Sequence, residues 1–226
     1  MLEKCALHDL TTEPYAVVWR MQQDIVRAMK EDPSEAEHLI LVEHPRVVTV
    51  GRRGSPAAEF RLSAEEICAR GFEVFHVERG GRTTYHGPGQ LVGYPILRLA
   101  RLGSDVHRYL RLLEELMIRV AARFGVAAER REKLTGVWAG ERKLASIGIA
   151  VTRWITYHGF ALNVATNLED FSVIEPCGLA GVQMTRLADL VSPAPTMAEA
   201  RRAVREEFAG LFGVRFVEAA RQETIW

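Results

Sequence analysis

The chain has 226 residues, 48% of them hydrophobic, which is enough apolar material for a substantial core without disulfides. Its 29 basic and 29 acidic residues cancel, so net charge gives no attraction to nucleic acid. The longest apolar run, residues 144–151, is far shorter than the roughly 20 residues of a membrane span, and the N-terminus lacks the apolar core of a signal peptide. We expect one domain over residues 1–226, in a soluble cytoplasmic protein without nucleic-acid or membrane partners.

The first half of the chain predicts two helices and four strands. Apolar residues at helical spacing indicate an amphipathic helix over 14–30. A shorter helix is predicted over 63–71, where Ser63 and Glu66 form a capping box and Gly71 ends the helix. Short apolar runs predict strands at 38–44, 47–51, 72–79 and 91–99, the first two on either side of a turn at Pro45.

The second half begins with the strongest helical pattern, residues 104–125, starting at Ser104 and ending at Gly125. A helix capped by Thr196 and Glu199 comes near the end. Strands are predicted at 136–140, 143–151, 154–164 and 214–219, and the first three follow one another closely enough to pair antiparallel. Runs of strands with helices set apart predict an α+β fold, with a mixed, largely antiparallel sheet flanked by helices.

A glycine-rich segment, RGGRTTYHGPGQ, precedes the strand predicted at 91–99. It has neither of the frames typical of phosphate-binding loops, and no helix follows whose N-terminus could hold an anion. Glycines that open onto a strand permit close approach of a ligand or of another backbone. A ligand site is therefore indicated, and an elaborate turn with a bulge is the structural alternative.

Three cysteines, at positions 5, 68 and 177, form no CxxC pair, and no histidine is spaced for a metal site, so we expect neither a disulfide nor a structural zinc. We also expect no cofactor. Cys68 fits a small buried hydrophobic position on its helix. Cys177 lies between a proline and a glycine in EPCGL, a turn that presents the thiol as a nucleophile. A buried, inert thiol is the alternative.

Lys143 opens an apolar strand and is one of only four lysines in a chain with 25 arginines. Near Cys177, its ammonium would stabilise the thiolate and exchange protons as general base and acid. A lysine at a strand end can also extend into solvent. The 34 positions between the two residues leave open whether they meet.

Four blocks of sequence resemble the lipoyl(octanoyl) transferase family, in the same order and at similar spacing. They are RGGRTTYHGPGQLVGYPI, GVWAGERKLASIGIAV, WITYHGFALNV and IEPCGL. The resemblance implies a fold similar to biotin and lipoate protein ligase catalytic domains. It also implies transfer of an octanoyl group from octanoyl-acyl carrier protein to a lysine of lipoyl domains, in 2-oxoacid dehydrogenase E2 subunits and the glycine cleavage H protein.

The same resemblance implies roles for individual residues. Cys177 would be the acyl-thioester nucleophile, and Lys143 would be its general base and acid. The residues expected to line the acyl site are Arg79, Gly80, Gly81, Arg82, Thr83, Thr84, Tyr85, His86, Ser146, Ile147, Gly148, Gly159, Phe160 and Ala161. We expect an apolar slot in which small residues, Ala145 among them, leave room for the chain.

Acyl carrier proteins and lipoyl domains are generally acidic, which makes Arg52, Arg53, Arg79 and Arg82 candidate docking residues. Two other functions remain open at this point. An ATP-dependent lipoate or biotin ligase would share the fold, and GRRGSP at 51–56 resembles its arginine-rich loop, but a ligase needs no cysteine nucleophile. A binding module without turnover would need neither Cys177 nor Lys143.

Overall fold

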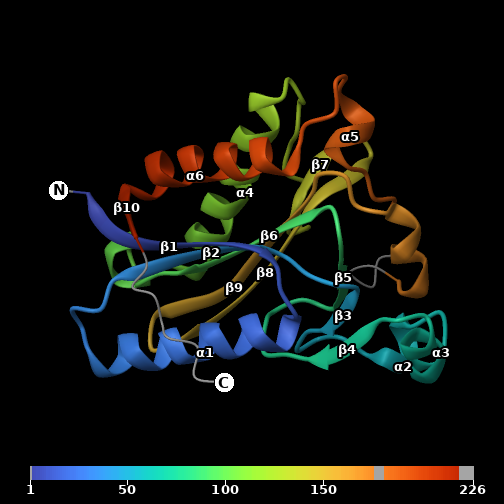
Figure 1. Cartoon of the computed structure of the whole chain (residues 1–226), viewed down its shortest axis with the longest axis horizontal. Coiled ribbons are helices and arrows are strands. Elements are labelled where there is room, and N and C mark those ends of the chain that lie inside the picture. The colour runs from blue at the N-terminus through green and yellow to red at the C-terminus, as the bar shows by residue number, and fades with distance from the viewer. Residues whose placement is uncertain (1, 176–180, 219–226) are drawn as a thin grey trace.

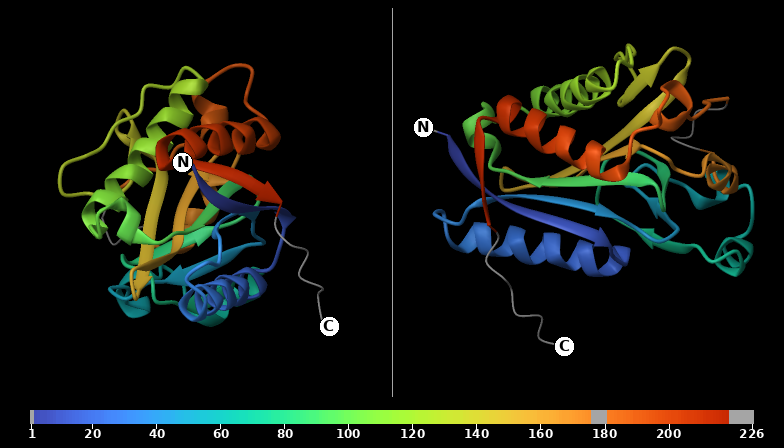
Figure 2. Two further views of the ribbon diagram at one scale, coloured as in Figure 1. Left: turned by 90° about the vertical axis from the view of Figure 1, so that its left-hand side faces the viewer. Right: turned by 45° about the horizontal axis from the view of Figure 1, so that its top comes forward.

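The computed structural model describes residues 2–175 and 181–218. Its centre is a seven-stranded sheet with helices on both faces (Figures 1 and 2). In spatial order the strands are β10 (Val214–Glu218), β1 (Glu3–Thr12), β2 (Glu37–Glu43), β6 (Gln90–Ile96), β9 (Ile155–Asn163), β8 (Arg142–Thr152) and β7 (Val137–Ala139). β1 pairs parallel with β10 and β2, and the remaining pairs are antiparallel.

A second, three-stranded sheet packs beside one end of the first (Figure 1). It consists of β4 (Glu73–His76), β3 (Val47–Val50) and β5 (Thr83–His86), in that spatial order. β3 runs parallel to β4 and antiparallel to β5. The glycine-rich segment therefore contains a strand, β5, for which the sequence predicted none.

Among the described residues, three long helices cover the main sheet. α1 (Tyr15–Glu31) lies on one face, and α4 (Val106–Arg123) and α6 (Met197–Phe212) lie on the other (Figures 1 and 2). The shorter helices are α2 (Pro56–Glu59), α3 (Ala64–Ala69), η1 (Leu99–Leu102), η2 (Leu168–Val173) and α5 (Leu187–Leu190). No helix among residues 2–175 and 181–218 is long and apolar enough to cross a lipid bilayer.

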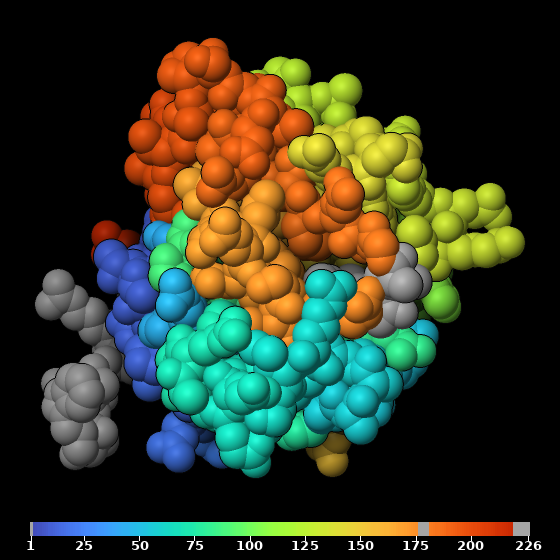
Figure 3. Space-filling model, turned by 90° about the vertical axis from the view of Figure 1, so that its right-hand side faces the viewer, coloured from blue at the N-terminus to red at the C-terminus, as the bar shows by residue number. Residues whose placement is uncertain are grey.

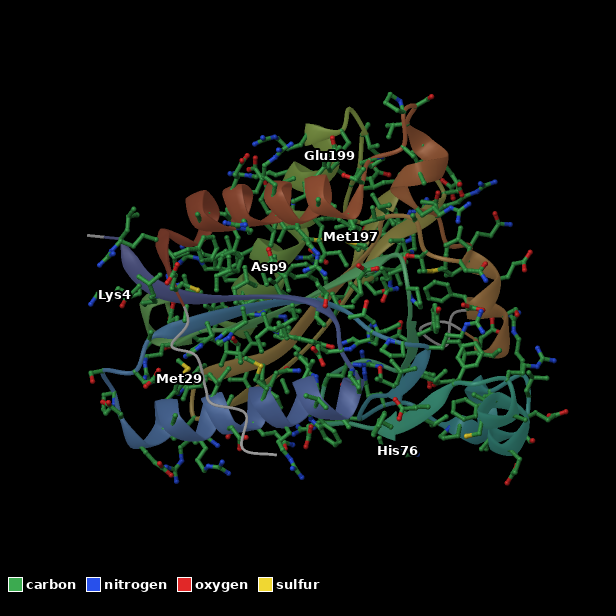
Figure 4. The ribbon with its side chains drawn as sticks, viewed as in Figure 1. Lys4, Asp9, Met29, His76, Met197 and Glu199 are labelled. Atoms are coloured by element: carbon green, nitrogen blue, oxygen red, sulfur yellow. The ribbon has the colours of Figure 1, made fainter. Side chains whose placement is uncertain are left out.

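Each face of the main sheet has its own hydrophobic core. Met29 of α1 packs on one face, and Met197 at the start of α6 packs against the core of the other (Figure 4). Arg201 of α6 donates to Asp9 of β1 at 2.6 Å, and Figure 4 shows Asp9 on the side of β1 that faces this helix. The apolar residues buried along one side of each helix thus explain why α1 and α6 pack on opposite faces of the sheet.

The predicted elements are confirmed with four differences. The strands on either side of Pro45 enter different sheets, and β1 was not predicted. α4 is capped by Asp105, whose carboxylate accepts from the amides of His107 and Arg108, and not by Ser104. Cys68 is exposed, so its assignment to the core was wrong.

Candidate active site

A β-bulge in β8 turns Lys143 onto the same face as Ser146. The pairing with β7 skips Leu144, because Trp138 faces Lys143 while the residue before it faces Ala145. In an unbulged strand, alternation would place Lys143 and Ser146 on opposite faces. With the bulge, both line a cavity, and Leu144 and Ala145 pack together in the hydrophobic core.

The side chain of Lys143 is buried, with 2% of its surface exposed. Its Nζ donates to the carbonyl of Thr135 at 3.1 Å and lies 5.1 Å from the centre of the Trp138 ring. A cation over an indole face is stabilised by the ring quadrupole. The alternative in which this lysine extends into solvent is therefore wrong.

The backbone of Lys143 is bracketed by the segment that follows residues 176–180. Its amide donates to the carbonyl of Gln183 at 2.8 Å, and its carbonyl accepts from the amide of Thr185 at 2.9 Å. Cys177 lies outside the described residues. The segment that hydrogen-bonds Lys143 begins six positions after Cys177 in the sequence.

The side chain of Arg79 hydrogen-bonds backbone carbonyls of the glycine-rich segment and of β3. Its Nη2 donates to the carbonyl of Thr49 at 2.6 Å, and its Nη1 donates to the carbonyl of Arg82 at 2.7 Å. Gly148 lies against it, since a Cβ at that position would come within 3.0 Å of the Arg79 Cδ. Arg79 is 7% exposed, so the docking role considered for it was wrong.

Two histidines line the cavity in neutral form. Burial, followed by the nearby His44 and Arg79, lowers the pKa of His86 to about 3. Burial also lowers the pKa of His158. His158 adopts a φ of +55° within β9 and donates its amide proton to the Gln22 Oε1 at 2.8 Å. A non-glycine residue held in the left-handed region of a strand carries strain that is typical of functional sites.

The cavity measures about 260 Å³ and lies between the two sheets. Of the predicted site residues, those that line it are Lys143, Arg79, Gly81, Arg82, Thr83, Thr84, His86, Ser146, Ile147, Gly148, Gly159, Phe160 and Ala161. Gly80 and Tyr85 are not among the lining residues. The Gly80 amide donates to the Ile149 carbonyl at 2.7 Å, and the Tyr85 hydroxyl donates to Asp170 at 2.8 Å.

Other lining residues had not been predicted: Tyr15, Arg53, Val92, Tyr94, Lys133, Leu134, Thr135 and His158. The wall is thus more polar than the expected apolar slot. Ala145 does not contribute to it, because the bulge leaves that residue in the core. The sequence offered two signals, the rarity of Lys133 and the position of His158 beside a predicted lining glycine.

The charge of the lining is one-sided. Among the described residues that line the cavity there is no aspartate or glutamate, whereas the cations Arg53, Arg79, Arg82, Lys133 and Lys143 all take part. Three of these five, Arg53, Arg82 and Lys133, are exposed and form the mouth of the cavity. Figure 3 shows this end of the molecule, with the yellow-green segment around residue 133 projecting at one side. The mouth therefore favours an anionic partner.

No group of three or more histidine, cysteine, aspartate or glutamate side chains within residues 2–175 and 181–218 is arranged to hold a metal ion. The buried polar groups at the site belong mainly to lysine, arginine, neutral histidine and tyrosine. These groups bind anions and exchange protons.

The sequence matches a known family of catalytic domains. The model described as lipoyl protein ligase A/B catalytic domain matches residues 14–209. Octanoyltransferase of Nostoc punctiforme is 44% identical over 97% of this chain and 93% of that protein. Octanoyltransferase of Geobacter metallireducens is 43% identical over 95% of this chain and 97% of that protein.

Solved structures of the same fold are more distant in sequence. Lipoate-protein ligase A bound with ATP superposes with a TM-score of 0.75 at 17% identity, covering 99% of this chain and 90% of that one. Biotin protein ligase of Aquifex aeolicus with biotin and ATP gives 0.54 at 10% identity, covering 92% and 70%. At these identities the likeness concerns the fold alone, and it confirms the predicted ligase-like α+β architecture.

Proposed function

Because the chain belongs to the lipoyl protein ligase A/B catalytic domain family and is an octanoyltransferase of lipoate biosynthesis, we propose the following donor, acceptor and catalytic residues for its reaction. The donor is octanoyl-acyl carrier protein. The acceptor is a lysine of a lipoyl domain, in 2-oxoacid dehydrogenase E2 subunits and the glycine cleavage H protein. The octanoyl group passes through a thioester on Cys177, and Lys143 serves as general base and acid.

The observation that carries this proposal is the burial of Lys143 in a cavity wall built from the residues that the resemblance assigns to the acyl site. The bulge at Leu144 directs the ammonium to that cavity. The Lys143 amide donates to the Gln183 carbonyl and the Lys143 carbonyl accepts from the Thr185 amide, in a segment that begins six positions after Cys177 in the sequence. This short separation is compatible with the proposed pair of Cys177 and Lys143, since six residues of chain span at most about 20 Å.

The proposed reaction has two balanced halves. In the first, the Cys177 thiolate attacks the donor carbonyl, the bond to the carrier sulfur breaks, and the carrier thiol leaves with a proton from Lys143. In the second, the acceptor amine attacks the enzyme thioester, Lys143 takes the amine proton, and the Cys177 thiolate is released. Thioester exchange is nearly isoenergetic and amide formation from a thioester is favourable, so no ATP is consumed.

The octanoyl chain would lie between the small sheet and the wall formed by β8 and β9. Val92, Ile147, Phe160 and Ala161 supply apolar surface there. Gly159 allows β9 and β6 to lie close together in this wall, because a Cβ at this position would come within 2.2 Å of the Gly93 carbonyl oxygen. Burying each methylene contributes about 0.8 kcal/mol, so these contacts can anchor the chain.

The cationic residues at the mouth of the cavity support the proposal that the partners are acidic proteins. Arg53 and Lys133 are exposed there, and Arg52 is exposed beside Arg53. Arg82 is already engaged, since its Nη1 donates to Glu59 at 3.0 Å. Arg52, Arg53 and Lys133 are therefore the proposed docking residues for the carrier protein and for the lipoyl domain.

Intact-protein mass spectrometry tests the mechanism. The enzyme is mixed with octanoyl-acyl carrier protein without ATP, beside a Cys177→Ser variant. We expect one octanoyl group on the wild type alone, and its discharge when an apo lipoyl domain is added. Modification of the lipoyl domain only with ATP and free octanoate would identify a ligase, and saturable binding without any turnover would identify a binding module.

A further inference from the structure

A chain of buried hydrogen bonds links the cavity to the backbone beside Lys143. Nδ1 of His86 bonds the Gln90 Oε1 at 2.8 Å, Gln90 Nε2 bonds the Asn163 Oδ1 at 2.9 Å, and Asn163 Nδ2 bonds the Thr185 carbonyl at 2.9 Å. All four residues are at most 7% exposed. Buried polar networks of this kind are costly unless every member is satisfied.

Backbone carbonyls fix the direction of donation. The Thr185 carbonyl can only accept, so the amide nitrogen of Asn163 faces it and the amide oxygen faces Gln90. Gln90 must then donate to Asn163, and it also donates to the carbonyl of Tyr85 at 3.3 Å. The Gln90 oxygen is left facing His86, so the imidazole donates from Nδ1.

This orientation defines what His86 offers to the cavity. With the proton on Nδ1, the remaining polar atom of the ring is Nε2, which carries a lone pair and no proton. The charged or titratable groups around the ring are Arg79, His44, His158 and Tyr15. With burial they keep the imidazole neutral, so His86 is a fixed hydrogen-bond acceptor.

The other end of the chain meets the site at Lys143. The Thr185 carbonyl is held by Asn163, and the Thr185 amide donates to the Lys143 carbonyl at 2.9 Å. Both backbone polar groups of this peptide position are therefore engaged. Asn163 thus anchors the segment that brackets Lys143 and begins six residues after Cys177.

We propose that Gln90 and Asn163 are positioning residues for acyl transfer. Gln90 sets the tautomer of His86, and Asn163 holds the 183–185 segment on Lys143. The proposal rests on the proposed function for its effect on turnover, because it assumes that Lys143 and Cys177 carry the reaction. Its effect on His86 can be observed without any turnover.

The first experiment observes the tautomer by long-range ¹H–¹⁵N NMR of histidine-labelled enzyme, with His86 assigned from a His86→Asn spectrum. We expect the Nδ1–H form from about pH 5 to pH 8. In Gln90→Glu, a carboxylate accepts the same hydrogen bond and should raise the pKa of His86 by about one unit or more, which is followed by titrating both proteins from about pH 3 to pH 8. An Nε2–H tautomer in the wild type, or an unaltered titration in the variant, overturns the role of Gln90.

The second experiment measures acyl-enzyme formation by quenched mass spectrometry. Asn163→Asp preserves size but sets a carboxylate oxygen against the Thr185 carbonyl. We expect kcat to fall at least about tenfold while KM for the donor stays within about twofold. Retention of the wild-type kcat by the folded variant overturns the role of Asn163.

Thr156→Val is the matched control. Thr156 lies on the same strand, is fully buried, and makes two comparable hydrogen bonds, to the Pro95 carbonyl at 2.8 Å and from the Leu97 amide at 2.9 Å. We expect a lower melting temperature and an unchanged kcat. If the wild type formed no acyl-enzyme, the proposed mechanism would fail, and the NMR experiment would still decide the role of Gln90.

Discussion

Gly136 lies directly against the side chain of Lys143: a Cβ at Gly136 would come within 2.6 Å of the Lys143 Cε. Gly136 also has a φ of +130°, which L side chains rarely adopt. We expect Gly136→Ala to displace the lysine and lower the rate of acyl transfer at least about tenfold. The backbone strain should also lower the free energy of unfolding by about 1–3 kcal/mol, measured by urea denaturation.

Gly140→Ala separates strain from displacement. Gly140 has a φ of +55°, but a Cβ there would meet no atom within 4 Å. We expect a stability loss of about 1 kcal/mol with an unchanged rate per folded molecule. Equal rate losses in the two variants would show that the contact with Lys143 is not the cause.

Much of the fold was accessible from the sequence because periodicity and capping agree. The box of Ser63 and Glu66 and that of Thr196 and Glu199 form as predicted. β1 escaped prediction because its sequence, EKCALHDLTT, mixes polar and apolar residues without clear alternation. Its pairing partners come from distant parts of the chain, β2 and β10, so tertiary contacts override weak local preference.

The site was harder to derive because it depends on departures from regular geometry. The bulge at Leu144 decides which face Lys143 occupies, and no sequence pattern predicts it. Tyr15, Tyr94 and His158 reach the cavity from three different elements, α1, β6 and β9, which only the packing of α1 on the main sheet brings together. The glycine-rich segment did indicate the site, and Gly89 shows the close backbone approach that its glycines suggested, since a Cβ there would come within 2.7 Å of the Ala165 backbone.

The docking surface predicts a charge effect. We expect the double variant Arg53→Glu with Lys133→Glu to raise KM for octanoyl-acyl carrier protein about tenfold at low salt and to flatten its salt dependence. Turnover of a small uncharged octanoyl thioester should not change, because a donor without negative charge gains no electrostatic attraction from the mouth. Steady-state kinetics with both donors at several salt concentrations check this.

Arg153→Glu controls for overall charge. Arg153 is exposed and lies past the far end of β8 from Lys143, roughly 30 Å along the strand. We expect no change in KM for the carrier. A similar rise in KM in this variant would mean that net charge, and not the mouth, governs binding.

The burial of His44 predicts that the free energy of unfolding depends on pH. Its Nδ1 donates to the Glu13 carbonyl at 2.8 Å, its Nε2 accepts from the Tyr94 hydroxyl at 2.8 Å, and burial lowers its pKa to about 4. The unfolded chain, with an ordinary histidine pKa of about 6.5, binds more protons between these values. The free energy of unfolding therefore falls on acidification through this window, by about 1.4 kcal/mol per pH unit for this residue.

Urea denaturation at pH values of about 7, 6 and 5 isolates this contribution. His44→Gln should reduce the pH slope by the stated amount, whatever the other histidines add. Tyr94→Phe removes a hydrogen bond but keeps the imidazole, so it should lower stability and retain the slope. Identical slopes in the wild type and His44→Gln would contradict the assignment.

Ala161 predicts control over acyl-chain length. It is 3% exposed, lines the cavity, and lies opposite Ser146 on β8 and Val92 on β6. Ala161→Leu adds three carbon atoms to the wall and removes room for the chain. Since each buried methylene is worth about 0.8 kcal/mol, the preference for octanoyl over hexanoyl should fall about tenfold in a direct competition of the two thioesters.

Ala145→Leu provides the control, because it overfills the core and should cost about 1–3 kcal/mol of stability without changing the ratio. A changed ratio in Ala145→Leu, or an unchanged one in Ala161→Leu, would place the acyl chain elsewhere.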